Sequence, residues 1–460
     1  MRATRRARAR GQAAAAVATV AAVAVALTLL DRVGPRTPAS AEPGRATSGA
    51  WICPHGGGGG REVAIYLANP GASTVTARVT GLEGRTPQPS TTVEVPSRAT
   101  VRVPVAADGE GAGTYVEFFG GWIGAGWVMS AGTEGLAAEP CAPEASDHWW
   151  LVDGTTELGE DDVLVITNPF QATAVLDVVI YSPERAPVRD SDWTDVEVRP
   201  RRSIALRVSE IVQGEAVTAA EIVVSVGRVV AASNGVTKDG GLRSAIGSTE
   251  TSASAVLPVI GGSGPSELLV LSAAESSIRF GATELSAEPP RPAGGLTEQD
   301  HGPFAARAYP VDVGPGATGI RLFTLEGATV AAALRAIGPG EDQGSTGGAI
   351  RPAADWLVLP SLVGGSAEPA LALVNDGEED AEVRIEILAR EGGAAAAPIT
   401  VDVPAHGAAA APAAFLASAP GSAVLVRSDV PVVALGSASA EGPRGAGFAL
   451  SLGVAVPPTA

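Results

Sequence analysis

The sequence predicts an all-β fold: tandem immunoglobulin-like β-sandwich domains behind one N-terminal transmembrane or signal helix. An alternating apolar run leading to Asn-Pro, or to a degenerate copy of it, recurs at Asn69, Asn168, Ser272 and Asn375, at spacings of 99, 104 and 103 residues. No helix-period pattern extends over four turns outside the N-terminal segment. A second signature, a small residue after β-branched residues, recurs at Ile123-Gly124-Ala125, Val229-Val230-Ala231, Thr329-Val330-Ala331 and Val432-Val433-Ala434.

The repeat length identifies the folding unit. A solenoid unit takes roughly 20 to 50 residues, whereas a period of about 100 residues suits one complete β domain. Gly and Pro interrupt the alternating runs about every 8 to 12 residues, as in a two-sheet sandwich. A four-bladed propeller with enlarged blades is the alternative, although blades normally take about 40 to 50 residues. The predicted domains span residues 51–145, 146–252, 253–350 and 351–460.

Period-2 alternation places the strands within each repeat. In the first repeat they are expected at 62–67, 74–79, 91–95, 100–103, 114–119 and 127–130. In the second they are expected at 162–167, 174–181, 195–198, 203–208 and 221–232, with a helical turn at 209–213. The third repeat is the most degenerate, with a Pro-rich connection at 288–293. In the fourth they are expected at 370–374, 381–388, 399–403, 423–427 and 430–436.

The N-terminal segment predicts the location of the chain. Residues 1–12 form a basic tail with five arginines, followed by an uncharged apolar run at 13–30. This run is long for a signal-peptide core and just long enough for a spanning helix. The arginines place the tail in the cytoplasm and the domains outside, behind a Pro- and Gly-rich linker at 31–50. The alternative is secretion after cleavage near Ala41, within an A-x-A pattern.

The charge of the predicted ectodomain limits its partners. Beyond residue 30 the chain carries 27 basic and 50 acidic side chains. An acidic surface repels phosphate backbones, so nucleic acid is not an expected partner. The expected partners are an envelope protein or a cell-wall glycan, and the cytoplasmic membrane through the N-terminal helix. No cofactor is expected.

The two cysteines of the chain, Cys53 and Cys141, both belong to the first repeat and lie near its two ends. In an exported protein, an isolated pair within one domain predicts a disulfide and not a metal site. Two buried free thiols are the alternative.

The opening of the first repeat resembles a known kind of protein. Trp51-Ile52-Cys53-Pro54 is followed by a glycine-rich loop and then by Tyr66-Leu67-Ala68-Asn69-Pro70-Gly71. This pattern is similar to an uncharacterised family of exported proteins of high-GC Gram-positive bacteria, in which a domain of unknown function follows one N-terminal membrane segment. The resemblance covers nearly the whole chain after residue 50. It implies an extracytoplasmic location and supplies no catalytic residue.

Catalytic and metal-binding patterns are weak in this sequence. The four histidines are His55, His148, His301 and His406, and three of them directly precede Gly, which predicts turns. No G-x-S-x-G elbow surrounds a serine. The acidic stretch Asp190–Asp195 departs from the calcium-loop pattern at its sixth and twelfth positions, so we interpret it as a solvated turn. We therefore expect no enzyme and no metal site.

The aromatic residues are concentrated in the first repeat. We identify Tyr115, Phe119, Trp122 and Trp127 as a possible binding face, since exposed aromatics suit sugar stacking or a protein partner. Packing in the core is the alternative for this set. Three further tryptophans, expected to be structural, occupy matching starts of repeats: Trp51, Trp150 and Trp356.

These observations favour a non-enzymatic, membrane-tethered extracytoplasmic scaffold or interaction protein of the bacterial cell envelope. The alternative is a carbohydrate or cell-wall binding module that uses the aromatics of the first domain. The mutual packing of the domains does not follow from the sequence.

Overall fold

The computed structural model describes residues 48–457 except for short gaps at 84–87, 132–134, 239, 261–265, 314–315, 339–341, 349–350, 361–366, 391–392, 394–395 and 443–444. Residues 46–458 belong to one compact unit. The predicted tail, apolar helix, cleavage site and linker up to residue 47 lie outside the described residues. Among the described helices, none has both the length and the apolar character needed to cross a bilayer.

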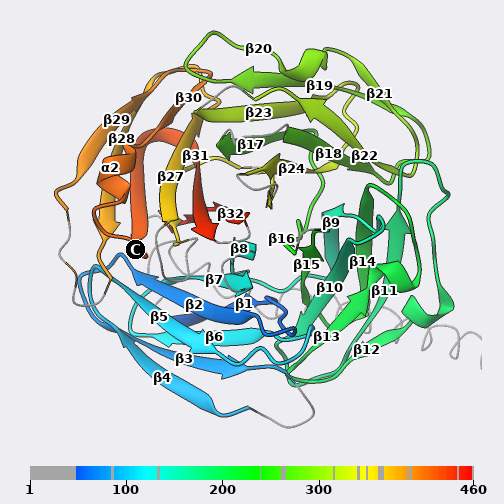
Figure 1. Cartoon of the computed structure of the whole chain (residues 1–460), viewed down its shortest axis with the longest axis horizontal. Helices are drawn as coiled ribbons and strands as arrows, with labels where there is room; N and C mark the ends of the chain where they lie inside the picture. The colour runs from blue at the N-terminus through cyan, green and yellow to red at the C-terminus, as the bar shows by residue number, and fades with distance from the viewer. Residues whose placement is uncertain are drawn as a thin grey trace, which may run out of the picture. The chain divides into compact units, whose positions relative to one another are not determined.

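Strands dominate the described chain, which confirms the all-β prediction, and they form antiparallel sheets in four successive groups (Figure 1). Repeat 1 contains β1 (Ser48–Cys53), β2 (Glu62–Asn69), β3 (Val75–Gly81), β4 (Ser90–Val95), β5 (Ala99–Val105), β6 (Thr114–Phe119), β7 (Gly124–Ala131) and β8 (Gly135–Pro140). Repeat 2 contains β9 (His148–Gly154), β10 (Asp161–Asn168), β11 (Ala174–Tyr181), η1 (Ser191–Trp193), β12 (Val196–Val198), β13 (Arg202–Arg207), η2 (Val208–Glu210), β14 (Thr218–Val226), β15 (Val230–Val236) and β16 (Leu242–Ile246).

The second half of the chain repeats this layout. Repeat 3 contains β17 (Ser254–Ile260), β18 (Ser266–Ser272), β19 (Ile278–Leu285), β20 (Arg291–Pro292), η3 (Ala293–Gly295), β21 (Gln299–His301), β22 (Ala305–Val311), β23 (Ala317–Thr324), β24 (Ala331–Ile337) and β25 (Gln343–Gly347). Repeat 4 contains β26 (Ala353–Val358), β27 (Ala367–Asn375), β28 (Ala381–Leu388), β29 (Ile399–Val403), β30 (Gly407–Ala410), α2 (Ala413–Leu416), β31 (Ala423–Gly442), β32 (Gly445–Leu452) and β33 (Val454–Ala455).

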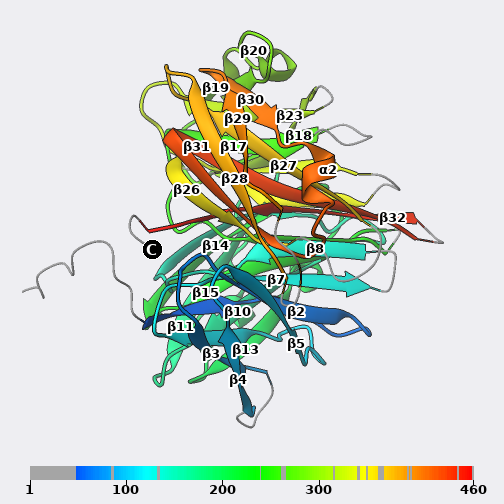
Figure 2. The ribbon, with the colours of Figure 1, turned by 90° about the vertical axis from the view of Figure 1, so that its left-hand side faces the viewer.

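Each repeat is a two-sheet sandwich, as predicted. We call the sheet that starts with the first strand of a repeat the outer sheet and the other the axial sheet. In repeat 1 these are β1-β6-β3-β4 and β5-β2-β7-β8, and repeats 2 and 3 follow the same order. In repeat 4 the long strand β31 belongs to both sheets, pairing with β26 and β28 and also with β27 and β32 (Figure 2).

Two predicted strand patterns were wrong in detail. The two strands expected at 423–427 and 430–436 are one continuous strand, β31. Conversely, the single run expected at 221–232 divides into β14 and β15, because the chain turns at Gly227, whose φ of 80° favours glycine.

The recurring Asn is a turn clamp. The Asn69 Nδ2 amide donates to the carbonyls of Ser73 (2.8 Å) and Val95 (3.0 Å), while Oδ1 accepts from the Gly71 amide (2.9 Å). Asn168 and Asn375 make the same three kinds of bond. All three side chains are fully buried, so the bonds satisfy polar groups that burial would otherwise leave unpaired. The periodic motif is therefore structural.

The recurring tryptophan packs inside the sandwich in repeats 1, 2 and 4, as Trp51, Trp149 and Trp356. The indole Nε1 of Trp51 donates to the carbonyl of Ile123 at 2.8 Å, within the second recurring signature. In repeat 2 the equivalent residue is Trp149, which donates to Val229 at 2.7 Å. Our assignment of Trp150 to this position was wrong by one residue, because Trp150 projects from the other face of β9.

Equivalent backbone hydrogen bonds join the four repeats in a closed cycle. In each case the donor is the second residue of the strand equivalent to β5 in its own repeat. The acceptor is the residue directly after the strand equivalent to β3 in another repeat. The bonds run from Ser203 to Leu82 (3.0 Å), from Ala306 to Ser182 (3.4 Å), from Ala408 to Ser286 (3.1 Å) and from Thr100 to Ala389 (3.0 Å). The fourth bond returns from repeat 4 to repeat 1, so the cycle uses the same contact at every junction.

The last strands of the axial sheets meet one another. β8 contacts β16 and β32, and β25 contacts the same two strands, which closes a second and inner cycle. β8, β16 and β32 lie near the centre of Figure 1. Small residues permit this approach: a Cβ on Gly447 would lie 3.0 Å from that of Leu136, and one on Gly135 would lie 2.7 Å from Leu242 Cγ. These four strands, β8, β16, β25 and β32, are called the axial strands below.

Candidate functional site at the axial depression

A depression of about 570 Å³ opens where the axial strands end. Its lining comes from all four repeats, and its size falls within the range of roughly 300 to 1,000 Å³ typical of ligand sites. The lining includes Trp51, Trp122, Cys141, Pro143, Glu144, Trp149, Ile246, Gly247, Glu250, Gly348, Arg351, Gly453, Val454 and Pro457.

Four lining residues occupy equivalent positions at the ends of the axial strands. Their amides each donate to an alanine carbonyl of the neighbouring strand: Cys141 to Ala125, Gly247 to Ala231, Gly348 to Ala332 and Gly453 to Ala434. This register corrects the third copy of the second signature, where Ala332 and not Ala331 is the equivalent alanine. The depression therefore lies on the common axis of the four repeats.

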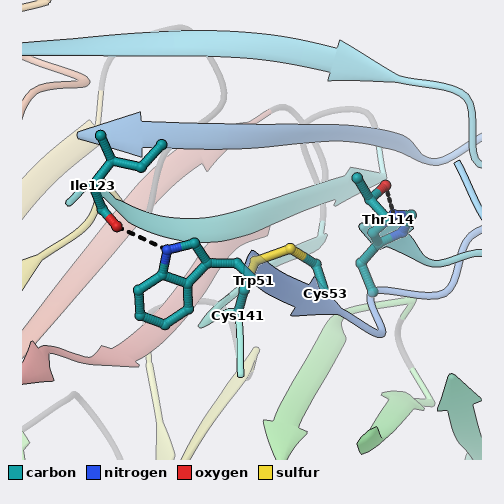
Figure 3. The surroundings of a disulfide bond; sticks show 6 residues. Trp51, Cys53, Thr114, Ile123 and Cys141 are labelled. Carbon is teal, nitrogen blue, oxygen red and sulfur yellow. Dashed lines mark hydrogen bonds between the residues drawn. A yellow bond between two sulfur atoms is a disulfide. The ribbon is translucent and has the colours of Figure 1, made fainter. Parts of the chain in front are cut away.

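Repeat 1 supplies the rigid wall of the depression (Figure 3). Cys53, the last residue of β1, forms a disulfide with Cys141, directly after β8, which confirms the predicted bond. Beside it the rings of Trp51 and Trp122 meet edge to face, with centroids 6.0 Å apart. Trp51 is almost completely buried, whereas Trp122 is half-buried and retains ring surface that a ligand can contact.

The rim of the depression is charged. Glu144 is exposed, and Arg351, in the segment after β25, pairs with Glu250, in the segment after β16, at 3.3 Å. Both partners of this pair are at least half exposed, so the pair contributes little stability and remains open to a ligand.

The structure separates the four residues predicted as a binding face. Trp122 lines the depression. Phe119 is 46% exposed at the end of β6 and does not belong to the lining. Tyr115 packs against repeat 2, where the guanidinium carbon of Arg201 lies 4.5 Å from its ring centroid. Trp127 is 1% exposed, so its place in an exposed face was wrong: it points inward from β7, into the repeat 1 core.

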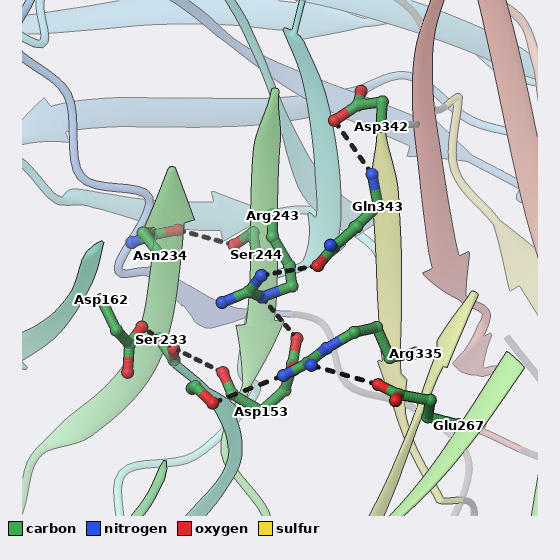
Figure 4. Close-up of polar contacts among 11 residues, drawn as sticks. Asp153, Asp162, Ser233, Asn234, Arg243, Ser244, Glu267, Arg335, Asp342 and Gln343 are labelled. Atoms are coloured by element: carbon green, nitrogen blue, oxygen red, sulfur yellow. Dashed lines mark hydrogen bonds and ion pairs between the residues drawn. The ribbon is translucent and has the colours of Figure 1, made fainter. Parts of the chain in front are cut away.

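A buried ionic network, absent from the sequence interpretation, lies beside the axial strands (Figure 4). Asp153 on β9 accepts from Arg335 Nε on β24 at 2.7 Å and pairs with Arg243 Nε on β16 at 2.8 Å. Arg335 also reaches Glu267 at 3.2 Å, and Arg243 donates to Gln343 at 2.8 Å. The network therefore ties repeat 2 to repeat 3.

Burial shifts the pKa values of three carboxyl groups in and beside this network, those of Asp153, Asp162 and Glu139. Burial disfavours the charge of Asp153, but Arg243 and Arg335 outweigh it and lower its pKa. Burial raises the pKa of Asp162 to about 7, although Arg243 and the Ser233 hydroxyl oppose the rise. Glu139 on β8 is fully buried, and burial raises its pKa well above the ordinary range.

Two histidines are buried and use both ring nitrogens inside the protein. His55 contacts the Gly56 carbonyl (2.6 Å) and the Thr114 hydroxyl (2.8 Å), and burial lowers its pKa to about 4. His301 contacts Tyr309 and the Ala305 carbonyl, and burial likewise lowers its pKa to about 4. His301 lies in strand β21 and not in the turn that its neighbouring glycine had indicated.

The acidic stretch around residue 190 is a capped turn. Asp190 precedes η1, and its carboxylate accepts from the Asp192 amide at 2.8 Å. Within the described ranges, no group of three or more His, Cys, Asp or Glu side chains is placed to hold a metal ion.

Comparison with known proteins matches part of this chain to a family. Residues 105–280 match the model of a family of unknown function, DUF5719. This segment covers repeat 2 and the adjoining parts of repeats 1 and 3, and it fits the expected domain of unknown function. No curated protein matches the chain. A solved tetra-tandem repeat from the extending region of a large adhesion protein is 11% identical over 84% of this chain and 93% of that chain, with a TM-score of 0.10.

Proposed function

We propose that this chain is a non-enzymatic interaction protein of the bacterial cell envelope, tethered to the membrane by its N-terminal segment, which binds its partner in the axial depression. The observation that carries the proposal is the composition of that depression: all four repeats contribute to one site with an aromatic wall and a charged rim. A site that needs every repeat explains why the four are joined in one unit.

The two buried histidines support a role other than catalysis. Nucleophilic catalysis requires a histidine beside a serine or cysteine that it can activate. The two cysteines are joined in the disulfide, and the fully buried His55 and His301 use their ring nitrogens in contacts inside the protein. Neither histidine lines the depression.

A second candidate function is carbohydrate or cell-wall binding. The half-buried ring of Trp122 favours it, because an accessible indole face in a depression suits stacking against a sugar ring. The two candidates place the ligand in the same site and differ in its chemistry.

A reporter fusion tests on which side of the membrane the domains lie. We expect a reporter that is active only in the cytoplasm to stay silent when it is fused after Ala460, because the arginine cluster retains the N-terminus inside. The same reporter fused after residue 12 provides the positive control. Activity of the Ala460 fusion would contradict the proposed location, whether the chain is anchored or is cleaved near Ala41.

Binding through the depression predicts different behaviour for two aromatic residues of repeat 1. We expect Trp122→Ala to weaken retention of residues 46–460 on purified cell wall about thirtyfold if the ligand is a glycan, which is the loss of one aromatic contact of about 2 kcal/mol. Phe119→Ala is the matched control: it removes an exposed ring from the same repeat but outside the depression. An equal loss of cell-wall retention in both variants would contradict binding in the depression. It would favour a binding surface that includes Phe119.

A protein partner is tested in living cells. We expect a photo-cross-linking residue at position 122 to give a discrete protein adduct, and the same residue at position 119 to give none. An adduct at 122 that reproduces with the purified partner supports the first candidate, whereas retention on cell wall without any adduct supports the second. Absence of both would overturn the assignment of the depression as a binding site.

A further inference from the structure

The indoles of the depression differ in whether their N–H groups are already used. Three indoles belong to the lining, and two of them, Trp51 and Trp149, donate to backbone carbonyls of their own repeats. The N–H of Trp122 has no acceptor in the part of the chain that the structure describes. Because Trp122 is only half-buried, it can hold a ligand both by its ring and by one donated hydrogen bond.

Four residues at the ends of the axial strands, Cys141, Gly247, Gly348 and Gly453, are called the floor of the depression below. Their amides all donate to alanine carbonyls of neighbouring strands. The three glycines have no side chain, and the sulfur of Cys141 is in the disulfide. A ligand group that seats on the floor therefore finds no free N–H and no polar side chain. Such a floor favours an apolar ring over a ring that carries hydroxyl groups, because buried polar groups need partners.

The rest of the lining adds apolar rings and an excess of acid. Pro143 is exposed and Pro457 is half-buried, so both present ring surface to a ligand. Arg351 is paired with Glu250, whereas Glu144 has no ionic partner among the described residues. The chain beyond residue 30 is also strongly acidic. The rim therefore attracts a ligand with a basic group.

We propose that the depression binds an extended, proline-containing segment of an envelope protein, with a basic residue next to the prolines. This ligand rests on the binding function proposed above and gives that function its chemical class. Proline lacks an N–H, and a polyproline II helix makes no internal hydrogen bonds, so the segment brings carbonyl acceptors and few donors. The N–H of Trp122 supplies a donor for one such carbonyl, the floor receives an apolar proline ring, and Glu144 faces the basic residue.

Two other kinds of ligand match these groups less well. A sugar ring can stack on Trp122, but its hydroxyl groups extend around the whole ring, and the floor offers them neither an N–H nor a polar side chain. An ordinary extended peptide has an N–H at nearly every residue and binds best along a free sheet edge. The four axial strands instead cover one another. Aromatic-lined grooves accept proline segments at low entropic cost, because the polyproline II helix is preformed.

The test measures fluorescence anisotropy of two labelled peptides with the compact unit, residues 46–460. One peptide is a run of prolines that ends in two arginines. The other has the same arginines behind alternating glycine and serine, so it matches the charge but not the backbone shape. We expect the proline peptide to bind at least tenfold more tightly. Equal affinities, or no binding of either peptide, would overturn the proposal.

Three variants place the proline peptide on the protein. Trp122→Ala is expected to weaken its binding at least tenfold, as for the loss of an anchoring aromatic residue. Trp122→Phe retains a ring without the N–H, and its affinity is expected to lie between those of Trp122→Ala and the unaltered protein. Phe119→Ala removes an exposed ring outside the depression and is expected to bind normally. Full binding by Trp122→Ala would overturn the placement in the depression. If Trp122→Ala does not fold, Trp122→Phe and the comparison of the two peptides still decide.

The basic residue of the ligand is tested through Glu144. At low salt, Glu144→Gln is expected to weaken the arginine-containing proline peptide about two- to fivefold, as for one exposed ion pair. The same substitution is expected to leave a proline peptide without arginine unaffected. An unchanged affinity for the arginine-containing peptide would contradict the basic residue in the proposed ligand.

Three results separate the chemistry of the ligand from the existence of the site. A protein adduct at position 122 without binding of the proline peptide would leave the depression as a binding site and overturn this ligand. Cell-wall retention that Trp122→Ala abolishes, without peptide binding, would make the ligand a glycan. Self-association of residues 46–460 that Trp122→Ala abolishes would make a second copy the occupant, which also overturns the proline segment.

Discussion

Replacing Asp153 by Asn is expected to lower the free energy of unfolding by about 3 to 5 kcal/mol, the cost typical of breaking a buried ion pair. The side chain is 1% exposed and pairs with both Arg243 and Arg335. The substitution leaves these two guanidinium groups buried between repeats 2 and 3 without their common counter-charge. Urea unfolding at pH 7 measures the loss.

The control for this experiment is an exposed pair of the same kind. Arg78 and Glu117 pair at 2.6 Å on the outer sheet of repeat 1, with side-chain exposures of 48% and 21%. Glu117→Gln is expected to cost less than about 1 kcal/mol, because solvent screens the charges. An Asp153→Asn variant as stable as Glu117→Gln would show that the buried network contributes no more than a surface pair.

Removing the disulfide is expected to have an effect of similar size. The bond joins residues 88 positions apart, and the chain-entropy model assigns a loop of that length about 4 to 5 kcal/mol. We expect the double variant Cys53→Ser, Cys141→Ser to unfold at a correspondingly lower urea concentration. The reduced native protein should move to the same midpoint, whereas reductant should leave the double variant unchanged.

A contrary result would be equally informative. If the double variant matched the oxidised protein, the neighbouring repeats would be holding the ends of β1 and β8 in place without the covalent link. Leu242, Leu357 and Leu425 from repeats 2 and 4 do pack into the core of repeat 1, and they are the residues through which such support would act.

The sequence predicted the sandwiches because their motifs are local. Asn69 binds backbone groups within its own repeat, so its recurrence at Asn168 and Asn375 is readable as a period. The cysteine pair was predicted for the same reason. Trp149 was missed in favour of Trp150 because adjacent tryptophans on one strand differ only in the face from which they project, and alternation alone does not say which face another repeat covers.

The depression and the buried network around Asp153 could not be predicted, because both depend on contacts between repeats. Two of the axial strands, β8 and β32, are rich in Gly, Ala and Leu, a pattern that indicates burial but not which surface covers them. Trp122 was identified as a contact residue because it is aromatic. Tyr115, Phe119 and Trp127 are aromatic too, and only the packing in the structure separates them from Trp122.

The junction from Thr100 to Ala389 has a consequence for how such a chain can vary. An open stack of domains can gain or lose a member, because its terminal members have a spare face. Here repeat 4 contacts repeat 1 through the same hydrogen bond that joins the other neighbouring repeats, so every repeat has two neighbours and none has an uncovered interface. The copy number is therefore fixed by geometry: deletion of one member leaves two faces uncovered, and a fifth has nowhere to insert. Rotating the order of the members along the gene, by contrast, preserves every contact.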